Sequence, residues 1–185
     1  MRSAIVIDIV GDSKVPAVVL ENVREGLELL FRLTFRSWLE ERELISVEES
    51  VSDGIPKVLR RRLLGRRSSS KVLILTTVDL RTCRRQHVAG MAEFGGRIAV
   101  VSLRGLCKPR DDLDLGSVLP NFDRLVCEAA HEIGHLFQLD HCAQVHCIMG
   151  VRDGAWWRRP IQAFCPVCQQ RLERALPPQD SLISQ

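Results

Sequence analysis

The chain has 185 residues, of which 45% are hydrophobic and 26% are charged, and its formal net charge is +3. These values are typical of about one globular domain and exclude a fibrous or largely disordered chain. No apolar run reaches the roughly 18 residues that cross a membrane. The short apolar stretch near the N-terminus is interrupted by Asp8, so we expect no export signal and predict a cytoplasmic location. The absence of tyrosine excludes any mechanism that uses a Tyr hydroxyl.

The N-terminal half alternates between the patterns of strands and helices. Residues 4–10 are rich in β-branched side chains and predict a strand, whereas apolar residues at helical spacing predict a helix over 18–43. The same criteria predict a short strand at 44–51, a short basic helix at 57–64, and strands at 71–79 and 97–103. This alternation predicts an α/β fold with a twisted sheet.

The C-terminal part begins with an irregular connection at 107–120. A helix is predicted to start near Asn121 or Asp123 and to continue to about residue 137, because its apolar residues recur every three or four positions. An irregular stretch containing Cys, Trp and Gly follows. A short helix at about 166–176 then closes the structured part.

The predicted helix at 121–137 contains His131-Glu132-Ile133-Gly134-His135, an HExxH motif. Residues four apart share one face of a helix, so both imidazoles can bind one metal ion, typically zinc. Zinc lowers the pKa of a bound water toward about 7, and the Glu132 carboxylate can then remove a proton as the general base. The motif therefore predicts zinc-dependent hydrolysis; the alternative is a helix with two surface histidines.

A third histidine, His141, follows six residues after His135. The pattern HExxHxxxxxH resembles the ligand spacing of the metzincin metallopeptidases. Metzincins usually have glycine midway between the second and third histidines, where the turn favours a positive φ. Here Gln138 occupies that position, and a positive φ costs it free energy. A catalytically weak or inactive zinc protein that binds a peptide or protein partner is therefore the alternative function.

Four of the seven cysteines form two short-spaced pairs, Cys142 with Cys147 and Cys165 with Cys168. Two such pairs joined by a loop fit a structural zinc site with four cysteine ligands. Thiolate ligands are favoured over disulfides in a chain with no expected export signal. His146 is an alternative ligand to Cys147. The sequence thus predicts two zinc ions per chain, one catalytic and one structural.

The run HEIGHLFQLDHCAQVHCIM, followed by FCPVC, resembles the archaemetzincins, in which the long metzincin motif continues directly into a four-cysteine zinc site. The resemblance implies a zinc metallopeptidase fold and a peptide or protein substrate. It also implies that Met149 is the Met-turn methionine beneath the catalytic zinc and that the 97–103 strand borders the substrate cleft. We predict one catalytic domain over 1–176, divided into an N-terminal subdomain at 1–138 and a zinc-rich subdomain at 139–176, followed by a polar tail at 177–185.

The remaining candidates have simpler interpretations. Cys127 is interpreted as a core residue and His87 as a solvated loop residue, and no role is assigned to Cys83 or Cys107. The basic run at 57–71 is interpreted as a solvated surface, with a nucleic-acid surface of a zinc-ribbon-like protein as the alternative. We expect neither a membrane nor a nucleic-acid partner. Trp156 and Trp157 could pack on the cysteine site or line the substrate cleft.

Overall fold

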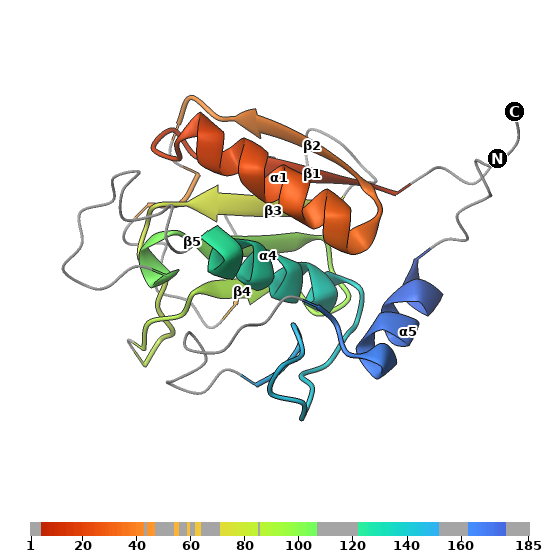
Figure 1. The fold of residues 1–185 in the computed structure, drawn as a ribbon. Coiled ribbons are helices and arrows are strands. Elements are labelled where there is room, and N and C mark those ends of the chain that lie inside the picture. Colours follow the sequence, from red (N-terminus) through yellow and green to blue (C-terminus); the bar gives the residue numbers. More distant parts are fainter. Residues whose placement is uncertain are drawn as a thin grey trace, which may run out of the picture.

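The structure, a computed structural model, describes residues 5–42, 44–46, 54–55, 59, 62–63, 71–84, 86–106, 122–151 and 163–176. It contains β1 (Val6–Gly11), α1 (Ala17–Phe31), β2 (Thr34–Leu39), β3 (Lys71–Thr76), β4 (Gly90–Ala92), β5 (Ile98–Ser102), the 3-10 helix η1 (Arg104–Leu106), α4 (Phe122–Leu136) and α5 (Pro166–Ala175). The strands form one sheet in the order β2-β1-β3-β5-β4, parallel except for β4, which is antiparallel to β5 (Figure 1). The predicted α/β fold is confirmed.

The central strands β1, β3 and β5 are buried on both faces, so they read as nearly continuous apolar runs. Side chains alternate between the two faces, because successive residues of a strand point in opposite directions. In β3, Leu73 and Leu75 belong to the core on the helical side of the sheet, whereas Val72 and Ile74 belong to the core on the other side.

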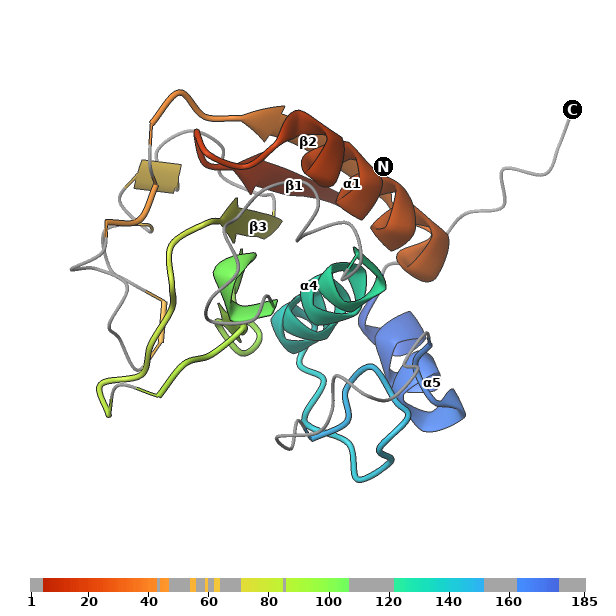
Figure 2. The same cartoon turned by 60° about the vertical axis from the view of Figure 1, so that its left-hand side comes forward.

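Helices α1 and α4 lie side by side on one face of the sheet, α1 over β1 and β2 and α4 over β5 and β4 (Figures 1 and 2). They approach closely at Gly26, where an added Cβ would lie 2.8 Å from Val126 Cγ2. Helix α5 lies at one end of this layer, where Phe164 meets Phe31 in an edge-to-face contact with ring centroids 5.5 Å apart. Both helices that carry predicted ligands, α4 and α5, therefore belong to one continuous core.

The helix predicted over 18–43 is wrong beyond residue 31. Arg32 adopts a left-handed conformation with φ 54° and ends α1, and β2 follows at Thr34. Phe35 and Leu39 continue the helical spacing, but Phe35 is the only fully buried residue of β2. Residues 34–39 form a strand because they pair in parallel with β1, a long-range interaction that periodicity does not reveal.

The other local predictions differ in outcome. Residues 44–46 form no strand, and the rest of the predicted 44–51 strand lies outside the described residues. In the predicted 57–64 helix, the described residues Leu59, Arg62 and Leu63 are helical. The predicted connection at 107–120 lies outside the described residues. Strand β4 was not predicted. Among the described residues, no helix is long and apolar enough to cross a membrane.

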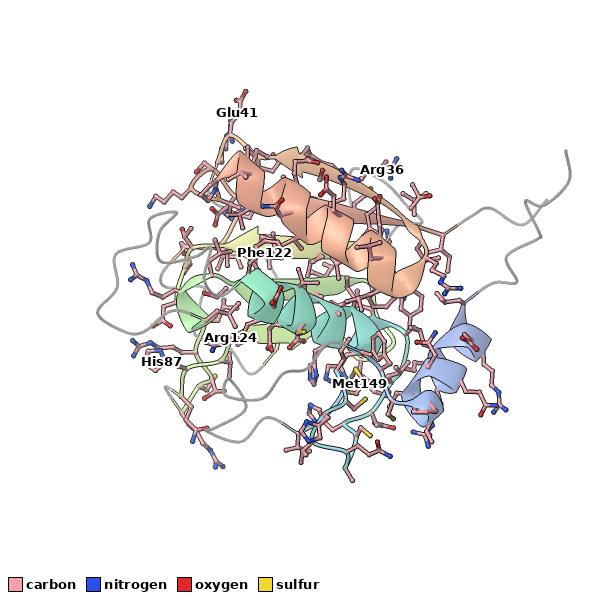
Figure 3. The ribbon with its side chains drawn as sticks, in the orientation of Figure 1. Arg36, Glu41, His87, Phe122, Arg124 and Met149 are labelled. Carbon is pink, nitrogen blue, oxygen red and sulfur yellow. The ribbon has the colours of Figure 1, made fainter. Side chains whose placement is uncertain are left out.

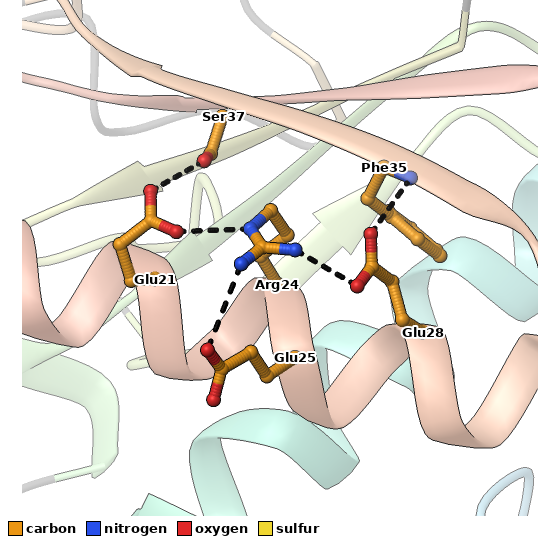
Figure 4. Close-up of polar contacts among 6 residues, drawn as sticks. All are labelled: Glu21, Arg24, Glu25, Glu28, Phe35 and Ser37. Carbon is orange, nitrogen blue, oxygen red and sulfur yellow. Dashed lines mark hydrogen bonds and ion pairs between the residues drawn. The ribbon is translucent and has the colours of Figure 1, made fainter.

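The outer surface of α1 carries a network of charged side chains that ties this helix to β2 (Figure 4). Arg24 contacts Glu21 and Glu28 at 2.9 and 2.8 Å. The Glu21 carboxylate accepts a hydrogen bond from the Ser37 hydroxyl at 2.7 Å. This hydrogen bond and the one from Arg24 hold the pKa of Glu21 below its ordinary value. The network lies on the solvent side of α1 and belongs to its surface.

Candidate metal centres

Helix α4 places the HExxH motif in the interior of the protein. Its first turn carries Asp123, whose negative charge suits a helix N-terminus. His131 and Glu132 are buried, with 3% and 5% exposed, and His135 is half-buried. The alternative of two surface histidines is therefore wrong.

The imidazoles of His131, His135 and His141 converge. One ring nitrogen of each lies within 4.8 Å of the others, and the Nε2 atoms of His131 and His135 are 3.1 Å apart. Two nitrogens bound to one tetrahedral zinc at about 2.0–2.1 Å would be separated by about 3.4 Å. The three residues thus fit one zinc ion.

Backbone carbonyls orient two of these rings. His131 Nδ1 donates to the Ile148 carbonyl at 2.7 Å, and His135 Nδ1 donates to the Leu139 carbonyl at 2.8 Å. A carbonyl can only accept, so each neutral ring is protonated at Nδ1 and keeps the lone pair on Nε2 for a metal. Burial lowers the pKa of His135, which further favours the neutral form.

The turn after α4 has the conformation that the sequence predicts for it. Gln138 has φ 63°, in the left-handed region where glycine is favoured. The turn returns the chain to His141, which is exposed and yet reaches the other two imidazoles. The non-glycine residue therefore does not displace the third histidine.

Met149 and Glu132 lie on either side of this helical segment. Met149 is fully buried, and an added Cβ at Gly134 would overlap its sulfur atom. In Figure 3 it lies near the C-terminal end of α4. On the sheet side, an added Cβ at Gly90 would lie 2.8 Å from Glu132 Oε1, so the carboxylate rests against β4.

The resemblance implied that the 97–103 strand borders the substrate cleft, but that strand does not lie at the edge of the sheet beside Glu132. Strand β5 lies between β3 and β4, so the strand at the edge of the sheet beside Glu132 is β4. The position of a three-residue strand at an edge depends on long-range pairing, which the local sequence pattern does not contain.

The four predicted cysteines form the second cluster. The sulfur atoms of Cys142, Cys147, Cys165 and Cys168 lie within 4.8 Å of one another, and all four cysteines are free. Cys142 Sγ and Cys165 Sγ are 3.8 Å apart, the separation of about 3.8 Å expected for two thiolates at about 2.3 Å from one tetrahedral zinc. A hydrogen bond from a Cys168 backbone N–H lowers the pKa of Cys165 to about 7, whereas burial raises the pKa of Cys147 and of Cys168.

Other candidates lie apart from both clusters. Cys127 is buried in the core, as predicted, and the exposed His146 belongs to neither cluster. His87 is largely exposed and its Nδ1 lies 2.8 Å from Asp79 Oδ1. Figure 3 shows His87 well separated from Met149. The predictions for Cys107, Trp156, Trp157 and most of the basic run fall outside the described residues.

Sequence reasoning missed the groups that orient the ligands. The carbonyls of Ile148 and Leu139 have no residue-type signal, because every residue has a carbonyl. Lys71, which donates to the Leu136 carbonyl at the end of α4, was visible only as a member of the basic run. Gly90 lies in a strand that was not predicted.

The fold, with its HExxH helix and a third histidine beyond the following turn, is that of the metzincin class of proteins. Comparisons with known proteins identify the family within this class. Residues 67–174 match Peptidase family M54. The archaemetzincin of Haloarcula marismortui is 30% identical over 77% of this chain and 84% of its own length. This chain belongs to peptidase family M54, and its resemblance to the archaemetzincins is confirmed.

Further relatives agree. The archaemetzincin of Methanopyrus kandleri is 36% identical over 107 residues, and the match spans 57% of this chain and 57% of that protein. Its crystal structure superimposes with a TM-score of 0.72 at 26% identity, covering 94% of this chain and 96% of the other. A zinc-dependent peptidase from Methanocorpusculum labreanum superimposes with a TM-score of 0.71 at 26% identity, covering 90% and 99%.

Proposed function

We propose that this chain is a zinc-dependent metallopeptidase in which His131, His135 and His141 hold a catalytic zinc ion. The convergence of three imidazole nitrogens carries the proposal, together with the buried Glu132 carboxylate, which follows His131 in the sequence. Membership of a peptidase family supports it. When bound, zinc supplies a Lewis acid that polarises a carbonyl and lowers the pKa of a water molecule toward about 7.

Glu132 is the general base of this proposal. Its carboxylate removes a proton from the attacking water as the new C–O bond forms, and it later delivers a proton to the nitrogen that leaves when the C–N bond breaks. The contact with Gly90 supports this role, because a carboxylate held against a strand needs little reorganisation before it reacts.

The substrate of the proposed enzyme is a peptide or protein segment bound along β4. Among the described residues this strand pairs with β5 alone, so its other edge can accept an extended chain as an added strand. A substrate bound there would run past Glu132, which rests against Gly90.

The cysteine cluster is proposed to hold a second, structural zinc ion. Three of its four ligands are buried, as expected for a closed site without room for substrate. Met149 would then serve as the Met-turn residue beneath the histidine site. The reduced thiols that such a site needs agree with the cytoplasmic location predicted from the sequence.

Zinc analysis combined with one substitution tests the proposal. We expect about two zinc ions per chain after mild dialysis, and hydrolysis of a fluorogenic peptide library. Glu132→Ala should keep both ions while the hydrolysis rate falls by at least about a hundredfold, the usual effect of losing a general base. Glu25→Ala, at an exposed position on α1, is the matched control and should change neither quantity.

Two results would contradict the proposal in different ways. An unchanged rate in Glu132→Ala would remove this residue from the reaction. About one zinc ion per chain, together with no hydrolysis by the unaltered protein, would favour the alternative, a zinc protein that binds a peptide without cleaving it.

A further inference from the structure

The last turn of α4 ends at the residue after His135, and a side chain from another element accounts for one of its carbonyl groups. Backbone N–H groups donate to the carbonyls of Gly134 and His135. The carbonyl of Leu136 accepts instead from the ammonium of Lys71 at 2.7 Å. The end of the helix that carries two proposed ligands is thus closed by a side chain from β3.

Lys71 also holds a second segment. Its Nζ donates to the Gly96 carbonyl at 2.8 Å, in the turn between β4 and β5, and lies 4.8 Å from the centroid of the Phe137 ring. A cation is favoured at a helix C-terminus, and a cation over an aromatic face adds further attraction. One ammonium therefore connects β3, the end of α4 and the 93–96 turn.

The same turn contacts the strained residue of the ligand loop. Gly95 donates its N–H to the His135 carbonyl at 2.8 Å. Gly95 has φ 64°, and an added Cβ there would lie 2.9 Å from Gln138 Cγ. The side chain of Gln138 therefore rests on the turn that Lys71 holds through Gly96.

The position of Lys71 is electrostatically unfavourable apart from these contacts. Burial and the charge of Arg97 lower the pKa of Lys71, which shows that the surroundings oppose an ammonium there. A neutral apolar side chain of similar length would avoid this opposition but could not donate to the two carbonyls. The ammonium is therefore needed for the hydrogen bonds to the Gly96 and Leu136 carbonyls.

We propose that Lys71 is a positioning residue for the three-histidine site, which it supports by fixing the end of α4 and the turn that Gln138 strains. This inference rests on the proposed function, because it requires that the histidines bind a metal. A glycine at position 138 would remove the strain of the turn. In its absence, the contacts of Lys71 hold the turn, and they keep His135 and His141 close enough to bind one ion.

Metal titration of Lys71 variants tests the inference without measuring catalysis. Lys71→Met keeps the apolar stem and should weaken zinc binding at the histidines about tenfold, the lower end of the range for residues that orient metal ligands. Lys71→Arg should restore most of the affinity. Zinc binding at the cysteines serves as an internal reference, and cobalt spectra separate the two sites because thiolate ligands add charge-transfer bands.

The decisive comparison is made in a second background. If Lys71 acts by holding the strained turn, Lys71→Met should lower zinc affinity at the histidines by less than about threefold when Gln138→Gly is also present. Lys14→Met removes a lysine from the β1–α1 connection and should not affect either site. Should Lys71→Met fail to fold, Lys71→Gln replaces it in both backgrounds.

Each outcome has one meaning. Histidine-site affinity within about twofold of the unaltered protein, or an equal loss in both backgrounds or at both sites, would overturn the role of Lys71 and leave the proposed function intact. Absence of metal binding at the histidines of the unaltered protein would instead overturn the proposed function, and the inference with it.

Discussion

The two clusters of metal-binding side chains differ in what holds their ligand atoms. In the histidine cluster, His131 and His135 stand on one helix whose backbone geometry sets their separation. In the cysteine cluster, Cys142 and Cys147 lie in a segment with little regular structure, and Cys165 and Cys168 lie at the start of α5. Two ligands of the first cluster are thus set by one helix, whereas the second cluster joins two segments that are distant in sequence and meet in the core.

The two clusters also differ in their exposure to solvent. The histidines range from buried His131 to exposed His141, so one side of that cluster is open. Three of the four cysteines are buried. An open site can admit a reactant, and a closed one can only stabilise the chain.

The comparison also indicates which cluster depends on the other. The segment after Cys142 supplies the Ile148 carbonyl that orients His131, and it carries Met149 beneath α4. The Cys142 N–H donates to the Met149 carbonyl at 2.7 Å, which closes this segment on itself. Disrupting the cysteines should therefore disturb the histidines more than the reverse.

Cys165→Ser should have the largest effect. Loss of one thiolate should weaken zinc binding at the cysteines by more than about a hundredfold. Zinc affinity at the histidines should fall about tenfold, because the segment that orients His131 loosens. Zinc competition titrations at both sites measure this. Cys83→Ser, at an exposed cysteine outside the clusters, is the control, and undiminished histidine affinity in Cys165→Ser would make the sites independent.

Gly134→Ala should come next. An added Cβ would overlap the buried sulfur of Met149, so the unfolding free energy should fall by about 1–3 kcal/mol despite the better helix propensity of alanine. Gly26→Ala is the matched control, because its Cβ would also be crowded, against Val126. Both variants should unfold more easily in denaturant, but only Gly134→Ala should weaken zinc binding at the histidines. Equal zinc affinities in the two variants would contradict the link through Met149.

Gln138→Gly should have a smaller effect of the opposite sign. Glycine relieves the left-handed strain at φ 63°, so the unfolding free energy should rise by about 1 kcal/mol and zinc affinity at the histidines about fivefold. Arg32→Gly relieves similar strain at φ 54° where α1 ends, and should stabilise the fold without changing zinc affinity. A fall in zinc affinity in Gln138→Gly would show that the glutamine side chain is needed at this turn.

Arg24→Ala should have the smallest effect. It removes the centre of the charged network on α1, and partly exposed surface ion pairs of this kind typically contribute about 0.2–1 kcal/mol each. The loss in unfolding free energy should shrink at about 1 M salt, where exposed charges are screened. Zinc affinity at both clusters should stay the same. A change in either affinity would mean that the α1 surface is energetically coupled to the metal centres.

The sequence by itself determined the parts of this protein that depend on neighbours along the chain. The spacing of His131, His135 and His141 and of the two cysteine pairs identified every member of both clusters, because ligand spacing is a local property. Alternating and continuous apolar runs located β1, β3 and β5 and most of α4 and α5. Even the positive φ of Gln138 was predicted, since the turn that returns His141 requires it.

Only the tertiary structure decided how these parts are held. Residues 34–39 form a strand rather than helix because β1 offers them an edge, and β4 exists as a partner of β5. The Ile148 carbonyl meets His131 across 17 residues, and Lys71 meets Leu136 across 65. A hydrogen bond between such distant groups depends on where the whole fold brings them, and a carbonyl common to every residue leaves no pattern from which to predict it.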